Sequence, residues 1–151
     1  MENVTDGFPY SKDELKKICI TVDFLILQSC NNIADKCTSD QLEQVLGGYN
    51  NLKFILFLVW EYYGFGNVNS VVGLREISPL ADLNELYKYT MFKAQLKGDP
   101  EGNIENLLNE IEQENPFDYC GRIENSDKVN DKLIKIFRHL LSNIRSGNLA
   151  L

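Results

Sequence analysis

The sequence is poor in metal-binding residues, with one histidine and four cysteines among 151 residues. No two cysteines form the C-x-x-C pair typical of structural zinc sites, and His139 is the only histidine that could join them. A carboxylate dimetal site would need more than one histidine. We therefore expect neither a metal nor a cofactor. Cys19, Cys30 and Cys37 follow the apolar positions of the first predicted helix, so we expect reduced, structural thiols there.

Long hydrophobic runs and targeting signals are also missing. The first fourteen residues contain neither a basic region nor an apolar stretch, so they predict no signal peptide. The most hydrophobic run, from Leu52 to Trp60, includes Lys53 and is far shorter than the roughly 20 residues of a membrane span. We expect a cytoplasmic protein without a membrane partner, and we expect this run to be a buried helix.

The sequence also lacks known catalytic motifs and an excess of positive charge. There is no phosphate-binding glycine loop, no nucleophile elbow and no metalloprotease motif. The 15 basic residues are outnumbered by 22 acidic ones, which gives a net charge of −7. Such a surface repels phosphate groups, so general binding to nucleic acids or anionic membranes is disfavoured. RNA binding would need a local basic patch.

What the chain does contain is helical periodicity over most of its length. Apolar residues recur at steps of three and four, and no stretch alternates for long enough to predict a strand. The length favours one domain, residues 1–151. We therefore predict an all-α, single-domain helical bundle of about five helices, with approximate boundaries 11–37, 38–64, 78–98, 103–114 and 126–146.

Capping residues mark several of these boundaries. Ser11 with Glu14, and Thr38 with Gln41, match the capping box that begins a helix. Ser78, followed by a proline, predicts the start of the third helix, and residues 65–78 predict a loop. The third helix carries an apolar stripe of Leu80, Leu83, Leu86, Tyr87, Met91 and Phe92.

The last predicted helix carries the one basic patch that we find. Its members share or flank one helical face: Lys135, Arg138, His139, Ser142, Arg145 and Ser146. An arginine beside a hydroxyl on a rigid helix can hold a phosphate, and a histidine there can act as a general acid or base. The alternative is a polar face whose cations complement the negative end of the helix dipole.

An aromatic cluster, made of Trp60, Tyr62, Tyr63 and Phe65, closes the second predicted helix. One interpretation assigns these residues to the core and the helix terminus. The other makes Trp60 and Tyr63 anchors for a protein partner, because tryptophan and tyrosine are common in interface hot spots.

Acidic residues are concentrated between Asp99 and Asp131, where the sequence has ten acidic residues and only two basic ones. Pairs such as Glu110 and Glu114 lie at helical spacing and are expected on a solvated face. One alternative function is therefore a protein-interaction module or inhibitor that binds a basic partner protein.

The segment FRHLLSNIRSGNL, residues 137–149, resembles the end of a HEPN domain. HEPN domains are small helical bundles, and many are metal-independent ribonucleases. Their signature is an arginine, usually a polar residue, and then a histidine, often followed by Gly-Asn and an apolar residue.

Two alignments to that signature are possible. The one that matches more positions has Leu141 in place of the arginine and Ser146 in place of the histidine. The other begins at Arg138, with His139 at the polar position and Asn143 at the histidine position. Both lack the motif histidine, so the general acid or base of the family mechanism is missing.

The resemblance implies a homodimer or heterodimer formed through the last helix, RNA or a partner protein as target, and a bacterial or phage defence context of the toxin–antitoxin kind. A first hypothesis is a catalytically degenerate HEPN-like bundle that acts through dimerisation or partner binding. A second is the acidic interaction module. A third is an active metal-independent endoribonuclease, with Arg138, His139 and Asn143 as its catalytic residues.

Overall fold

The structure is a computed structural model that describes residues 8–33, 35, 38–118 and 125–149. Within these ranges it contains helices and no strand, which confirms the prediction of an all-α helical bundle. The elements are α1 (Lys12–Ile33), α2 (Ser39–Tyr62), α3 (Val71–Arg75), α4 (Leu83–Leu96), α5 (Pro100–Gln113), the 3₁₀ helix η1 (Pro116–Asp118) and α6 (Ser126–Arg145).

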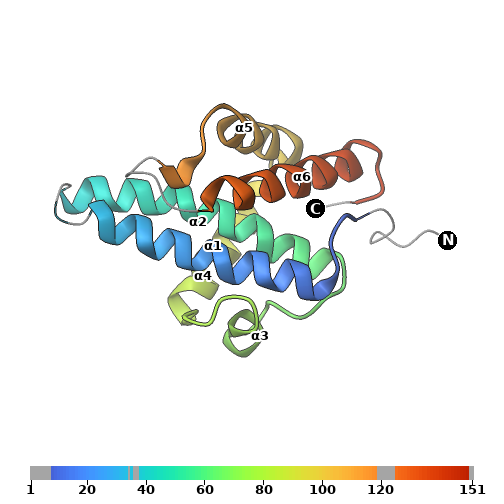
Figure 1. Ribbon diagram of the computed structural model, residues 1–151. Coiled ribbons are helices and arrows are strands. Elements are labelled where there is room, and N and C mark those ends of the chain that lie inside the picture. The colour runs from blue at the N-terminus through green and yellow to red at the C-terminus, as the bar shows by residue number, and fades with distance from the viewer. Residues whose placement is uncertain (1–7, 34, 36–37, 119–124, 150–151) are drawn as a thin grey trace.

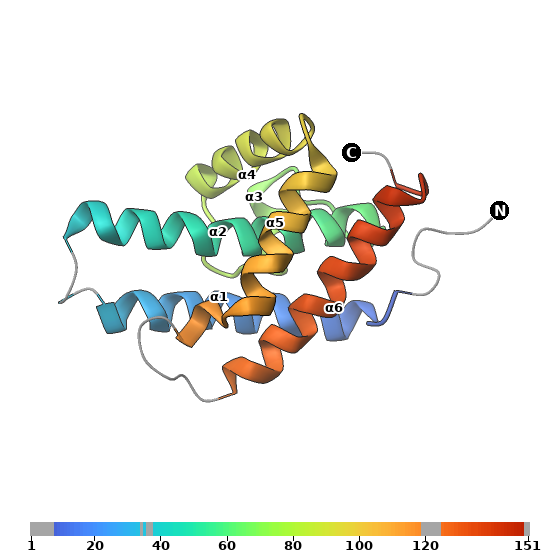
Figure 2. The same ribbon diagram turned by 90° about the horizontal axis from the view of Figure 1, so that it is seen from above.

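The two longest helices, α1 and α2, form an antiparallel pair at the centre of the fold (Figure 1). Helices α5 and α6 pack against each other and lie over one side of this pair, while α3 lies on the opposite side. Figure 2 shows α4 beside α2, on the side away from α1. No helix in the described ranges is both long enough and apolar enough to cross a membrane.

Both predicted capping boxes are present. The Glu14 amide donates to Ser11 Oγ over 3.2 Å, and the Ser11 amide donates to the Glu14 carboxylate over 3.0 Å. Thr38 and Gln41 make the same reciprocal pair of bonds at the start of α2. These bonds satisfy backbone donors that have no partner within the helix, so they determine where each helix begins.

The core is formed largely by α2 and by the apolar faces of α1 and α6. All residues from Leu52 to Trp60 are buried, so the prediction that this run is a buried helix is confirmed. On α6 the predicted stripe is buried at Leu133, Ile136, Phe137 and Leu140. Burial keeps the Cys19 thiol protonated by raising its pKa. Cys37 and Cys120 lie outside the described residues.

The predicted start of the third helix was wrong. Helix α4 begins at Leu83, and Asp82 caps it by accepting a bond from the Glu85 amide over 2.9 Å. Ser78 is not a cap, because its hydroxyl donates to Asp23 of α1 over 2.7 Å. The predicted loop 65–78 also contains the short helix α3, whose N-cap is Ser70.

The predicted start of the fourth helix was late by one turn. Helix α5 begins at Pro100, because Asp99 caps it by accepting a bond from the Gly102 amide over 3.1 Å. Residues 100–102, which the prediction left outside the helix, therefore belong to its first turn.

Candidate functional site

Four of the predicted site residues come together on the surface between α5 and α6. Arg138, Ser142, Arg145 and Ser146 line an open cavity of about 610 Å³, and its apolar floor is formed by Leu108 and Leu141. Lys135 lies exposed one turn earlier on α6 and does not line this cavity. The helical spacing therefore placed the two arginines and the two serines on one side of α6, as predicted.

Both arginines of this cavity are paired with carboxylates of α5. The Arg138 guanidinium lies 3.0 Å from Glu112 Oε1. Arg145 Nε lies 2.7 Å from Glu101 Oε1, and its Nη2 lies 3.2 Å from Glu105 Oε2. The hydrogen bond to Glu101 raises the pKa of Arg145.

These pairs change the electrostatic character of the predicted basic patch. Two cations of α6 are opposed by three anions of α5, so the site carries no excess positive charge. A phosphate group would have to displace carboxylates that already occupy the guanidinium donors. The pairs are partly exposed, so salt screens them.

His139 and Asn143 face a different part of the molecule. The His139 ring lies 5.3 Å from the Phe8 ring and 5.6 Å from the Tyr63 ring, measured between centroids. Asn143 Nδ2 donates to the Tyr63 hydroxyl over 2.8 Å. The structure thus places Arg138 against Glu112, whereas the other two proposed catalytic residues contact the end of α2.

His139 has little access to solvent at its outer nitrogen. Nε2 is buried and has no hydrogen-bond partner among the described residues. Burial lowers the pKa of His139, because charging the ring there costs hydration energy. The neutral ring is therefore the form that the folded state favours, and it packs as an aromatic group against Phe8 and Tyr63.

This burial predicts a pH dependence of stability. In the unfolded chain a histidine has a pKa of about 6.5, whereas the pKa of His139 in the folded chain is lower. Below a pH of about 6.5 the unfolded chain therefore binds more protons than the folded chain, and the free energy of unfolding should decrease. Urea unfolding of the wild type and of His139→Gln at pH 7.5 and pH 5.5 would measure this effect. We expect a smaller loss in the variant, because carboxylates titrate equally in both proteins. Equal losses would contradict the assignment.

Trp60 is a core residue, which excludes its predicted role as a surface anchor. Its side chain has no exposed surface and packs edge-on against Phe65, with ring centroids 5.6 Å apart. Tyr63 is also buried, under the stacked ring of Phe8 at 4.7 Å. The aromatic cluster thus closes the core at the end of α2, and an N-terminal aromatic residue covers it.

Sequence reasoning missed a buried ion cluster. Lys53 Nζ lies 2.6 Å from Asp23 Oδ1 of α1 and also contacts the Glu85 carboxylate of α4. Their side chains are 11%, 13% and 16% exposed. Burial alone would lower the pKa of Lys53, but the two carboxylates outweigh it and raise the pKa. The sequence feature that could have revealed this cluster is Lys53, the one charged residue in the apolar run of α2. We call Asp23, Lys53 and Glu85 the Lys53 cluster.

Glu110 of α5 and Glu114, the residue that follows this helix, border a second open cavity, of about 570 Å³, between α2 and α5. Its floor includes Leu52 and Ile111, and its rim includes Glu110 and Glu114, which are exposed as predicted. In the acidic stretch, three carboxylates thus pair with arginines of α6, these two face solvent, and Asp99 caps α5.

The fold and the site define an all-α bundle whose last helix carries an internally paired polar strip. No family model, curated protein or solved structure matches the chain. The likeness of residues 137–149 to HEPN domains remains a resemblance of that segment.

Proposed function

We propose that the chain is a HEPN-like helical bundle that has lost catalysis and acts by binding another protein. The observation that carries this proposal is the pairing of Arg138 and Arg145 with glutamates of α5. Groups that would hold an RNA phosphate in an active ribonuclease are engaged within the chain itself.

The lack of a general acid or base at the motif position also supports the loss of catalysis. In the alignment that matches more positions, Ser146 occupies the place of the motif histidine, and its hydroxyl donates to the Asn143 carbonyl over 3.2 Å. A serine hydroxyl does not titrate near neutral pH, so it cannot replace a histidine as general acid or base. His139 packs away from Arg138, against Tyr63. The resemblance further supports a role in bacterial or phage defence.

A ribonuclease assay tests the proposal. We expect purified protein, incubated with labelled single-stranded RNA and a metal chelator, to leave the RNA intact at neutral pH. The matched controls are Arg138→Ala and His139→Ala. Cleavage by the wild type that both substitutions abolish would overturn the proposal and establish an active metal-independent ribonuclease. Cleavage that persists in both variants would indicate a contaminating nuclease.

A further inference from the structure

The open cavity between α2 and α5 combines an apolar floor with acidic side chains. Figure 2 shows α5 crossing over α2, and the cavity of about 570 Å³ lies between them. It is lined by residues of α2, of the C-terminal half of α5 and of the start of η1, and by no described residue of α6. It is therefore separate from the cavity of the two arginines. We call it the α2–α5 groove.

The floor of the α2–α5 groove is the outer surface of the core. Leu52 of α2 and Ile111 of α5 are buried residues whose outer atoms line the groove. Tyr49 holds the two sides together. Its hydroxyl donates to the Pro116 carbonyl over 2.8 Å, and its ring stacks on Phe117 with the centroids 5.9 Å apart. The groove is thus formed before a ligand arrives, which reduces the ordering that binding requires.

Gly48 leaves room along the α2 wall of the groove. Gln44, Gly48 and Leu52 recur every four residues, so they share one face of α2. Glycine is unfavourable inside a helix, yet a Cβ atom at Gly48 would meet nothing within 4 Å among the described residues. Packing within the described chain therefore does not require glycine here. Its effect is to keep the groove wide, so that a ligand can approach α2 closely.

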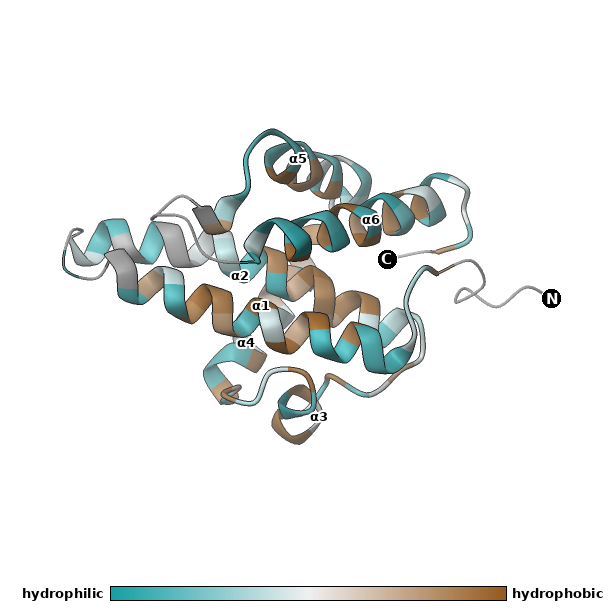
Figure 3. Ribbon diagram, in the orientation of Figure 1, coloured by the Kyte–Doolittle hydropathy of each residue, from teal (hydrophilic) through white to brown (hydrophobic). Residues whose placement is uncertain are grey.

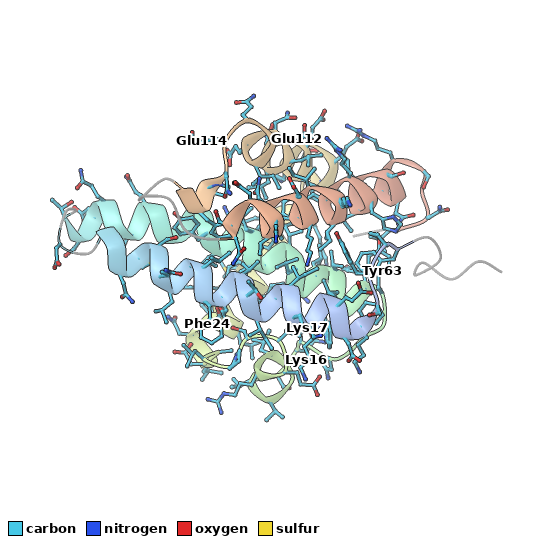
Figure 4. All side chains as sticks on the ribbon, viewed as in Figure 1. Lys16, Lys17, Phe24, Tyr63, Glu112 and Glu114 are labelled. Atoms are coloured by element: carbon cyan, nitrogen blue, oxygen red, sulfur yellow. The ribbon has the colours of Figure 1, made fainter. Side chains whose placement is uncertain are left out.

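The rim of the groove is acidic. Glu110 and Glu114 lie four residues apart and are exposed, and two like charges at this spacing repel each other. Neither forms an ion pair within the described ranges, whereas Glu112 pairs with Arg138 on the side of α6. Figure 3 shows hydrophilic residues along the outer side of α5, and Figure 4 shows Glu112 and Glu114 there. No basic residue is among those described as lining the groove.

These features select a cationic ligand that has an apolar part. The two carboxylates repel phosphate groups, so they disfavour nucleic acids and anionic lipids. They attract lysine and arginine side chains, which form charge-assisted hydrogen bonds with carboxylates. Pockets of roughly 300–1,000 Å³ bury ligands of small-molecule size. The groove therefore fits a short segment of a partner, with one apolar side chain on the floor.

We propose that the α2–α5 groove binds a basic segment of a partner protein. An apolar side chain of that segment lies over Leu52 and Ile111, and its lysine or arginine side chains pair with Glu110 and Glu114. The proposal deepens the proposed protein-binding function, on which it rests, by naming the surface and the chemistry of the partner.

Selection from a peptide library tests the proposal. The probe is a display library of random peptides, about a dozen residues long, presented to the immobilised full chain. We expect the enriched peptides to combine lysine or arginine with an apolar residue. An enriched peptide labelled with fluorescein is then titrated with the full chain, and binding is followed by fluorescence anisotropy. The affinity should fall as the salt concentration rises, because the rim charges are exposed.

Two glycine variants test whether the peptide occupies the groove. Gly48→Gln places a side chain in the groove and should weaken binding at least about tenfold. Gly47→Gln is the matched control and should leave the affinity unchanged. Gly47 is also exposed within α2 with nothing described within 4 Å of its Cβ position, but it does not line the groove. Both variants replace glycine in a helix with a better helix former, so both should fold.

Two charge variants test the rim. Glu110→Gln/Glu114→Gln removes two charges with little change of shape and should weaken binding about tenfold. Glu76→Gln/Asp131→Asn changes the net charge by the same amount at exposed positions that do not line the groove, and it should have little effect. Equal effects of the two double variants would show that net charge, and not the groove, attracts the peptide, which would overturn the proposal.

Three further outcomes would contradict the groove. They are enriched peptides that lack basic residues, a library from which no peptide is enriched, and peptides that bind Gly48→Gln as tightly as the wild type. In the last case the protein-binding function would stand, at another surface. RNA cleavage in the ribonuclease assay would overturn only the loss of catalysis, so the two proposals fail separately.

Discussion

Replacing Lys53 by methionine should lower the free energy of unfolding by about 3–5 kcal/mol, the cost of removing one partner from a buried ion pair. Asp23 and Glu85 would remain next to each other with their side chains 13% and 16% exposed and no cation between them. Both carboxylates have lost most of their hydration, so their repulsion is poorly screened. Chemical denaturation followed by circular dichroism would measure the loss.

Two further variants separate the charge effect from the loss of packing. The triple variant Asp23→Asn, Lys53→Met, Glu85→Gln removes the charges together, keeps an acceptor for the Ser78 hydroxyl, and should recover most of the stability. Lys88→Met changes an exposed lysine on α4 and should have little effect. A triple variant as unstable as Lys53→Met would show that shape, and not charge, determines the cost.

Trp60→Ala should lower the free energy of unfolding by about 3–5 kcal/mol, the usual cost of truncating a buried tryptophan. The side chain is completely buried and packs against Phe65, so its removal leaves a cavity that the rigid end of α2 cannot fill. Because Trp60 is the one tryptophan of the chain, unfolding of the variant has to be followed by circular dichroism.

The matched control for Trp60 is an exposed apolar residue. Val72 on α3 is 80% exposed, and Val72→Ala should change stability by no more than about 0.5 kcal/mol. If Trp60→Ala were as mild as this control, Trp60 would not be part of the core, and its predicted role as a partner-binding anchor would regain support.

Some features that depend on neighbours in sequence were predicted correctly, although the caps Asp82 and Asp99 were missed. The capping boxes at Ser11 and Thr38 use bonds between residues three positions apart, so residue spacing alone reveals them. The core face of α6 is equally clear, because its apolar residues occupy one side and polar residues occupy the other. On α4, apolar residues surround the helix, so spacing does not determine which side is buried. The bond from the Tyr89 hydroxyl to Glu61 of α2 helps to fix that choice.

The candidate site depends on contacts between distant segments, which a single sequence does not record. The basic patch and the acidic stretch were both recognised, but their mutual neutralisation follows from the packing of α5 against α6. His139 was placed on the correct helix, yet its covering by Phe8 joins residues from opposite ends of the chain. Helical spacing predicted which residues share a face. It did not predict what that face contacts.

The ion pairs between α5 and α6 have an evolutionary consequence. The affinity of the α6 strip for anions is controlled from another helix, because Glu112 occupies Arg138 and Glu101 and Glu105 occupy Arg145. A single substitution at Glu112, on the exposed side of α5, would release one arginine while α6 and its core face stay unchanged. A lineage of such proteins could therefore gain or lose affinity for phosphates by drift on α5, without risk to the fold.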